Sequence, residues 1–158
     1  MRGDGVPLDV VTLGGVCAPY VSGATVQALV SVESAGNPYA IGVVDGVLQH
    51  QPRDRAEAVA TVRALQAGRW NFSAGLGQIN VRNWARLGLD AQVVFDPCAN
   101  LRAMQRLLRE CYSAAPAEGQ ARLQAALSCY YSGNFSTGFR EGYVARVVAV
   151  AARWQEAR

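Results

Sequence analysis

Residues 22–42 read SGATVQALVSVESAGNPYAIG, and this stretch decides how the rest of the chain is interpreted. Ser22 is a good helix N-cap, because its side-chain oxygen can accept a backbone hydrogen bond from the first turn. The apolar residues after it recur at the three-and-four spacing of one helix face, namely Val26, Leu29 and Val30. We therefore predict a helix over residues 23–33.

Glu33 continues the apolar face of this predicted helix, four residues after Leu29. A carboxylate in that position loses contact with water, which is costly unless the group has a partner or a function. The residues from Ser34 to Pro38 are turn formers that end the helix, so Glu33 should lie at a helix terminus beside a loop. Taken alone, Glu33 is better explained as a cap or as the partner of a nearby arginine.

The rest of the chain is predicted to be mainly helical, giving an α+β fold with one small β-hairpin. Caps and apolar stripes predict further helices over 54–67, 96–111, 123–130 and 144–154, with a helix or turn through Trp84. Residues 42–51 alternate weakly and contain the turn signal Asp45-Gly46, so they form the only candidate sheet.

Length and composition fit one globular domain over residues 1–158, with residues 1–16 as a loosely ordered N-terminal segment. Hydrophobic residues make up 51% of the chain and charged residues 17%, which is ample material for one core. No apolar run approaches the roughly 20 residues that a membrane span requires. The first twenty residues lack the basic start and unbroken apolar centre of a secretory signal, so we expect a signal to be absent or already removed.

The charge of the chain does not indicate a nucleic-acid partner. The net charge is +3, and all fifteen basic residues are arginines scattered along the sequence. Nucleic-acid binding proteins usually concentrate their basic residues in one patch. We predict no nucleic-acid binding, and the charge suits a polyanionic wall polymer equally well.

Four cysteines are present: Cys17, Cys98, Cys111 and Cys129. They form no CxxC pair and the one histidine is distant, so we expect no metal site and no cofactor. Four cysteines allow three disulfide pairings, among which sequence alone does not choose. If the helices over 96–111 and 123–130 lie antiparallel, Cys98 comes near Cys129, and we predict that bond.

Two further segments carry polar residues among glycines. Residues 71–80 read NFSAGLGQIN, where two glycines in three residues let the backbone approach another group closely. Residues 130–134 read YYSGN. Alone, the first is an ordinary glycine turn, and Tyr130 and Tyr131 are core aromatics at the end of a helix.

The order of these pieces is more specific than any one of them. Glutamate-serine at a helix end, an Asn-Pro turn, GLGQIN, YYSGN and a terminal YVARVV helix follow one another. This order resembles the goose-lysozyme-like (SLT) lytic transglycosylases, most closely the members associated with type IV secretion and conjugation. The resemblance covers about residues 17–148, with ESAGNPYAIG, FDPCANL and ALSCYYSGN in the family's order. It implies a lysozyme-like fold with the hairpin beside the active-site cleft.

The resemblance also implies roles for particular residues. Glu33 matches the family's catalytic glutamate. The implied substrate-binding residues are Ser34, Ser73, Gly75, Leu76, Gln78, Asn80 and Tyr130. Two positions depart from the family pattern: Gly42 stands where many relatives have a serine, for which we expect Ser73 to compensate, and Tyr131 stands where the usual asparagine would follow the tyrosine.

The reaction implied by the resemblance is cleavage of the β-1,4 bond between N-acetylmuramic acid and N-acetylglucosamine, with formation of 1,6-anhydro ends. The expected partners are peptidoglycan glycan strands and components of a secretion system, and the expected compartment is the periplasm. Two alternatives stay open. One is a hydrolytic lysozyme that uses water and a second carboxylate, with Asp45 or Asp54 as candidates. The other is a non-catalytic wall-binding scaffold.

Overall fold

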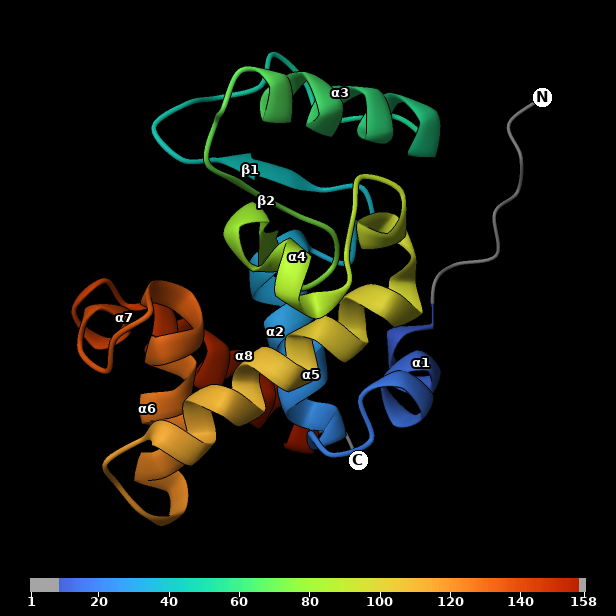
Figure 1. Cartoon of the computed structure of the whole chain (residues 1–158). Helices are drawn as coiled ribbons and strands as arrows, with labels where there is room; N and C mark the ends of the chain where they lie inside the picture. Colours follow the sequence, from blue (N-terminus) through green and yellow to red (C-terminus); the bar gives the residue numbers. More distant parts are fainter. Residues whose placement is uncertain (1–8, 157–158) are drawn as a thin grey trace.

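The computed structural model describes residues 9–156 and confirms a mainly helical protein with one small sheet (Figure 1). The elements follow along the chain as α1 (Val10–Cys17), α2 (Gly23–Ser34), β1 (Ile41–Val43), α3 (Arg55–Ala67), β2 (Phe72–Ala74), β3 (Ile79–Asn80), η1 (Val81–Asn83), α4 (Trp84–Leu87), η2 (Val93–Phe95), α5 (Pro97–Ala114), α6 (Gly119–Ser132), α7 (Thr137–Arg140) and α8 (Tyr143–Glu156). The predicted caps of α3 and α5 are confirmed: Asp54 accepts from Glu57 N and Asp96 from Ala99 N.

Helix α2 is the centre of the molecule. The predicted N-cap is confirmed, since Ser22 Oγ accepts from Thr25 N at 3.3 Å. Every residue from 25 to 30 is buried, as expected of a helix that is covered on all sides. Helices α1 and α8 pack directly on it, and α5 crosses in front of it (Figure 1). The end of α2 that carries Glu33 points toward the sheet.

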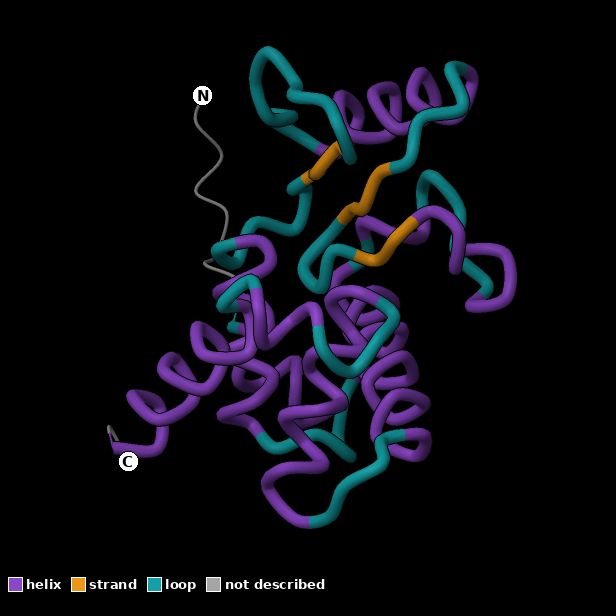
Figure 2. Tube along the Cα trace, turned by 90° about the vertical axis from the view of Figure 1, so that its left-hand side faces the viewer, coloured by secondary structure: helices purple, strands orange, loops and turns teal. Residues whose placement is uncertain are grey.

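The three strands are antiparallel in the order β1-β2-β3 and lie between α3 and the helical body (Figures 1 and 2). Ile41 is opposite Ala74, and Ser73 is opposite Asn80. The predicted hairpin over 42–51 is therefore wrong, because β1 pairs with the distant glycine-rich segment.

A side chain takes the place of the missing hairpin strand. The turn at Asp45-Gly46 does form, with Asp45 in the left-handed region at φ 57°. The chain that returns from it contacts β1 through Gln51, whose Oε1 accepts from Ile41 N and whose Nε2 donates to Ile41 O, both at 2.9 Å. These bonds satisfy the groups that a neighbouring strand would otherwise bind.

The N-terminal part of the chain is more ordered than predicted. The loosely ordered segment was expected over residues 1–16, but α1 begins at Val10, with Asp9 as its N-cap. A disulfide from Cys17 to Cys98 attaches α1 to α5, which explains the order. Residues 1–8 lie outside the described part of the chain. Between residues 9 and 156, no helix is both long and apolar enough to cross a membrane.

The predicted Cys98–Cys129 disulfide is also wrong. The bonds are Cys17–Cys98 and Cys111–Cys129, with Cα separations of 5.3 and 5.7 Å. The prediction assumed that α5 and α6 run alongside each other over their whole lengths. Instead α6 turns away and meets α5 near Cys111, while the first turn of α5 faces α1 (Figure 1).

We expect the two disulfides to contribute unequally to stability. The Cys17–Cys98 bond closes a loop with a sequence separation of 81, against 18 for Cys111–Cys129. Constraint of the unfolded chain then predicts losses of about 4 and about 3 kcal/mol in the free energy of unfolding when each pair is replaced by serines. Urea denaturation of the two double variants measures both values. A larger loss for the Cys111–Cys129 pair would contradict this order.

Candidate active site

A cleft of about 770 Å³ lies between the sheet and helices α5 and α6. Glu33 from the end of α2 lines it together with residues of β1, β2, α4, α5 and α6. Gln78 also lines it, from the glycine-rich loop, residues 75–78, between β2 and β3. The disulfide between Cys111 and Cys129 forms part of its wall. The structure thus brings together the segments that the sequence motifs singled out.

Glu33 is half-buried at the last turn of α2 and faces the cleft. Burial raises the pKa of its carboxyl group from an ordinary 4.5 to about 7, because the charged form is poorly solvated there. The Tyr143 hydroxyl and the positive charge of Arg146 act in the opposite direction and keep the pKa from rising further. The carboxyl group is therefore able to hold or release a proton near neutral pH.

Tyr143 is the main residue at this site that the sequence analysis missed. It opens α8 and is 1% exposed, and its hydroxyl is buried beside the carboxyl group of Glu33. It lies four residues before the buried Val147, so the helical spacing of YVARVV could have placed it on the inner face. Its ring stacks on that of Tyr131, with centroids 4.4 Å apart.

Tyr131 thereby acquires a role that the usual asparagine would not have. Tyr131 is 40% exposed at the cleft, and its ring covers one face of Tyr143. Its hydroxyl donates to the carboxylate of Glu141, just before α8. Tyr131 thus links α6 to the start of α8 and keeps Tyr143 beside Glu33.

Tyr130 lines the cleft and fastens α6 to the glycine-rich loop. Its hydroxyl donates to Gly77 O at 2.5 Å. A Cβ atom at position 77 would lie 2.9 Å from that hydroxyl and 3.0 Å from Met104 Cβ, so glycine is needed there. Burial, with the nearby charge of Glu33, holds the pKa of Tyr130 well above its usual value. Tyr130 is therefore a neutral hydrogen-bond donor.

Asn100 holds the glycine-rich loop from below. It is completely buried in α5, and its Oδ1 accepts from Gly77 N at 2.7 Å. Its Nδ2 donates to Ala74 O at 3.1 Å and to Val94 O at 2.8 Å. The sequence analysis quoted Asn100 within FDPCANL but gave it no role; its position four residues before Met104, on the apolar face of the helix, was the available signal.

The predicted substrate-binding residues divide into two groups. Ser73, Gln78, Asn80 and Tyr130 line the cleft, as the resemblance implied. Ser34, Gly75 and Leu76 do not, and their substrate-binding role is not supported. Ser34 Oγ donates to Val30 O inside α2, and Leu76 lies in the core. Gly75 has φ +84° and leaves room for Asn100, whose Nδ2 would be 2.0 Å from a Cβ atom.

The sheet explains how Ser73 can compensate for Gly42. Gly42 and Ser73 are directly opposite in the register of β1 and β2, so a side chain at either position would project from the same face. A Cβ atom at position 42 would approach Gln78 Oε1 to 2.9 Å. Gln78 Nε2 is occupied by Ala40 O and Gly75 O, so its Oε1 is the group left for a ligand.

Neither candidate for a second carboxylate lies in the cleft. Asp45 is part of the β1 turn and Asp54 caps α3, and neither lines the cavity. Glu110 does line it but is bound by Arg86 and Arg106. Of the described side chains, no three His, Cys, Asp or Glu gather as a metal site would require.

A family model described as "Transglycosylase SLT domain" matches residues 15–147. No solved structure matches the chain.

Two groups of curated relatives are similar over most of the chain. "Type IV secretion system protein virB1" of Brucella abortus biovar 1 (strain 9-941) is 45% identical over 150 residues, covering 89% of this chain and 63% of that protein. The protein of the same name from Brucella suis biovar 1 (strain 1330) gives the same values. "Protein virB1" of Rhizobium radiobacter is 36% identical over 138 residues, covering 85% and 57%. The chain thus spans less than two thirds of the length of these relatives.

The raised pKa of Glu33 predicts that Glu33→Gln stabilises the fold at alkaline pH. The folded state holds this proton up to a pKa of about 7 and the unfolded state only up to about 4.5. Stability therefore falls as pH rises between these values, and the full cost, on the order of 3 kcal/mol, is present above pH 7. In urea denaturation, the free energy of unfolding of Glu33→Gln should exceed that of wild type by this amount at pH 8. At pH 4 the two free energies should be equal.

Glu118→Gln is the matched control for this measurement. Glu118 is exposed before α6 and its side chain makes no cap hydrogen bond. A similar gain in the free energy of unfolding for Glu118→Gln, or no gain for Glu33→Gln at pH 8, would show that burial of the Glu33 carboxylate does not destabilise the fold.

Proposed function

The chain belongs to the transglycosylase SLT domain family, and on that premise we propose that it is a lytic transglycosylase of peptidoglycan, cleaving between N-acetylmuramic acid and N-acetylglucosamine. The observation that carries the proposal is the state of Glu33. It is half-buried in a cleft, and its pKa is raised to about 7. The other acidic residue that lines the cleft, Glu110, is held in an ion pair with Arg86. A reaction that needs one carboxyl group fits this site.

In the first step, neutral Glu33 acts as the acid. It donates its proton to the glycosidic oxygen while the bond from that oxygen to the anomeric carbon breaks. Because burial keeps the group protonated near neutral pH, the proton is available when the sugar binds. The acetamido group of the substrate stabilises the positive anomeric carbon, so the protein need not supply a second carboxylate.

In the second step, the Glu33 carboxylate acts as the base. It takes the proton of the muramyl 6-hydroxyl as that oxygen bonds to the anomeric carbon. The product is a 1,6-anhydro end, and Glu33 is neutral again. The two proton transfers balance, and no water is consumed.

Tyr143 acts between these two steps, when Glu33 is ionised. Its buried hydroxyl adjoins Glu33 and favours the charged form of that carboxyl group, and Arg146 adds a positive charge nearby. Once Glu33 is ionised, this hydroxyl is a donor that needs no reorganisation before it binds the carboxylate. Tyr143 therefore stabilises the intermediate state of Glu33 more than its neutral state.

Three polar groups at the sheet side of the cleft bind the glycan in this proposal. Ser73 accepts from Asn80 Nδ2 at 3.3 Å and keeps its own hydroxyl hydrogen for a ligand. Gln78 presents Oε1, as described above. Tyr130 keeps the backbone of the glycine-rich loop in place against the cleft.

We place this activity in the cell envelope, where it opens the wall for a secretion apparatus. The Brucella relatives named for type IV secretion support that setting. Two disulfides among the four cysteines fit an oxidising compartment such as the periplasm. Secretion-system components are then the proposed protein partners.

Product analysis tests the reaction. Digestion of purified peptidoglycan should release fragments with 1,6-anhydro ends, which mass spectrometry separates from reducing ends because they lack one water. Glu33→Gln should lower this activity by about a thousandfold, since the amide cannot donate or take the proton. Glu118→Gln is the control and should stay active.

The two alternative functions give different results. Reducing ends alone would show a hydrolytic lysozyme. Sedimentation of the wild type with cell walls without release of any fragment would show a wall-binding scaffold.

The role of Tyr143 is tested by Tyr143→Phe. The loss of a hydrogen bond to an ionised group should lower kcat by about tenfold or more. Because the hydroxyl lowers the pKa of Glu33, its removal should move the alkaline limb of the pH profile to higher pH. Tyr112→Phe, in an exposed tyrosine outside the cleft, is the control. An unshifted alkaline limb would refute this role.

A further inference from the structure

The side of the cleft formed by η1, α4 and α5 is positively charged. Arg82 and Arg86 line the cleft there, and Arg106 lies beside Arg86. Glu110 is the one acidic residue that lines this side within the described chain. This side of the cleft thus has three positively charged guanidinium groups and one negatively charged carboxylate.

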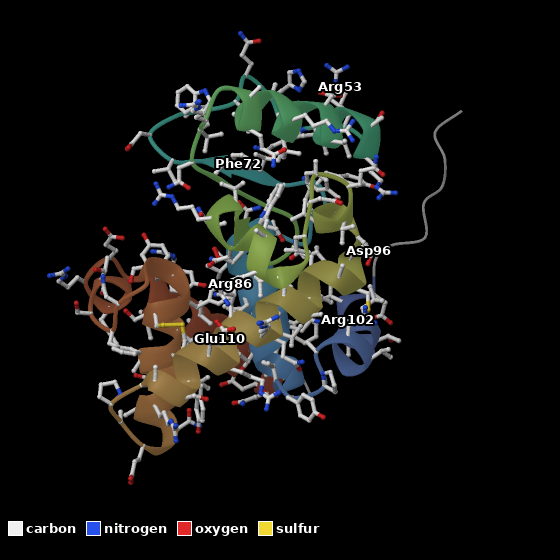
Figure 3. All side chains as sticks on the ribbon, viewed as in Figure 1. Arg53, Phe72, Arg86, Asp96, Arg102 and Glu110 are labelled. Carbon is white, nitrogen blue, oxygen red and sulfur yellow. A yellow bond between two sulfur atoms is a disulfide. The ribbon has the colours of Figure 1, made fainter. Side chains whose placement is uncertain are left out.

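Glu110 is fully engaged by two of these arginines. Arg86 Nη1 lies 2.9 Å from Glu110 and Arg106 Nε lies 3.2 Å from it. Figure 3 shows Arg86 of α4 and Glu110 of α5 facing each other. The hydrogen bond from Arg86 is the main reason that the pKa of Glu110 is lowered, so Glu110 is ionised. Arg86 also donates to Asn83 Oδ1 at 3.3 Å, which fixes its direction.

Arg82 is different, because its side chain is not used by the fold. It is exposed at the cleft, and its guanidinium makes no hydrogen bond or ion pair with any residue in 9–156. Its backbone is nevertheless fixed, since Arg82 N donates to Asn80 Oδ1 at 3.1 Å. Asn80 is in turn bonded to Ser73. The main chain that carries this free cation is thus fixed next to the residues proposed to bind the glycan.

The glycan itself offers no partner for this charge. The sugar rings and their acetamido groups are neutral, whereas the short peptides attached to the lactyl group of N-acetylmuramic acid carry carboxylates. Guanidinium groups bind carboxylates with paired, charge-assisted hydrogen bonds. We propose that Arg82, with Arg86 beside it, binds a carboxylate of the stem peptide, so that the protein prefers peptide-bearing strands. This inference rests on the proposed function.

The test compares two forms of one substrate. Glycan strands with their stem peptides are assayed as isolated and after carbodiimide coupling of the peptide carboxylates to ammonia, and the formation of 1,6-anhydro ends gives kcat/KM on each. Amidation removes the charge of the peptide without creating the free lactyl carboxylate that an amidase would leave on N-acetylmuramic acid. Wild type should prefer the unmodified strands by about two- to fivefold, the range expected for an exposed ion pair. For Arg82→Gln the ratio should fall to about one, mainly through KM.

Two further variants make the test specific. Arg102→Gln is the matched control, because Arg102 is an exposed arginine of α5 that lies toward α1 and does not line the cleft (Figure 3). It should keep the wild-type ratio. Glu110→Gln removes the competing carboxylate and should raise the ratio above that of wild type.

The outcomes separate this inference from the proposed function. A ratio of one for wild type, or an unchanged ratio in Arg82→Gln, would overturn the role of Arg82 while leaving the transglycosylase intact. The absence of anhydro ends from both kinds of strand would overturn both.

Discussion

The buried side chain of Asn100 is the interaction on which the site depends. Its three hydrogen bonds join α5 to β2, to the glycine-rich loop and to the turn before α5. A buried carboxamide left without these partners would be costly, so the four segments adopt one arrangement. The same glycine-rich loop accepts the hydrogen bond of the Tyr130 hydroxyl, at Gly77 O. The loop that places Gln78 at the cleft is thereby held in one position.

Within this frame, Glu33 is balanced between opposing influences. Burial disfavours its charge, whereas Tyr143 and Arg146 favour it. A carboxyl group influenced by burial alone would hold its proton too firmly to act as a base, and an exposed one would lose it too easily to act as an acid. The stacked pair of Tyr131 and Tyr143 brings the C-terminal helix into this balance. The residue at position 131 is thus part of the site's electrostatics although it differs from the family pattern.

Much of the fold could be predicted from the sequence, because helices are determined by neighbouring residues. The cap at Ser22 and the apolar stripe after it located α2, and the family order located Glu33 and Tyr130. The sheet and the disulfides were missed, because they depend on pairings across long stretches of chain. The same reason applies to Asn100 and Tyr143, whose roles arise from contacts between α5 or α8 and distant segments. Membership of the SLT family confirms the resemblance from which these site residues were inferred.

The contact of Gln51 with Ile41 has a consequence for solubility. The backbone N–H and C=O of Ile41 point away from β2, toward the open edge of the sheet, and Gln51 occupies both. An unpaired edge strand invites another chain to add to the sheet, and natural proteins block such edges. Here one carboxamide does so for a strand only three residues long. At Ile41 the edge of the sheet therefore has no free backbone group for another strand to join.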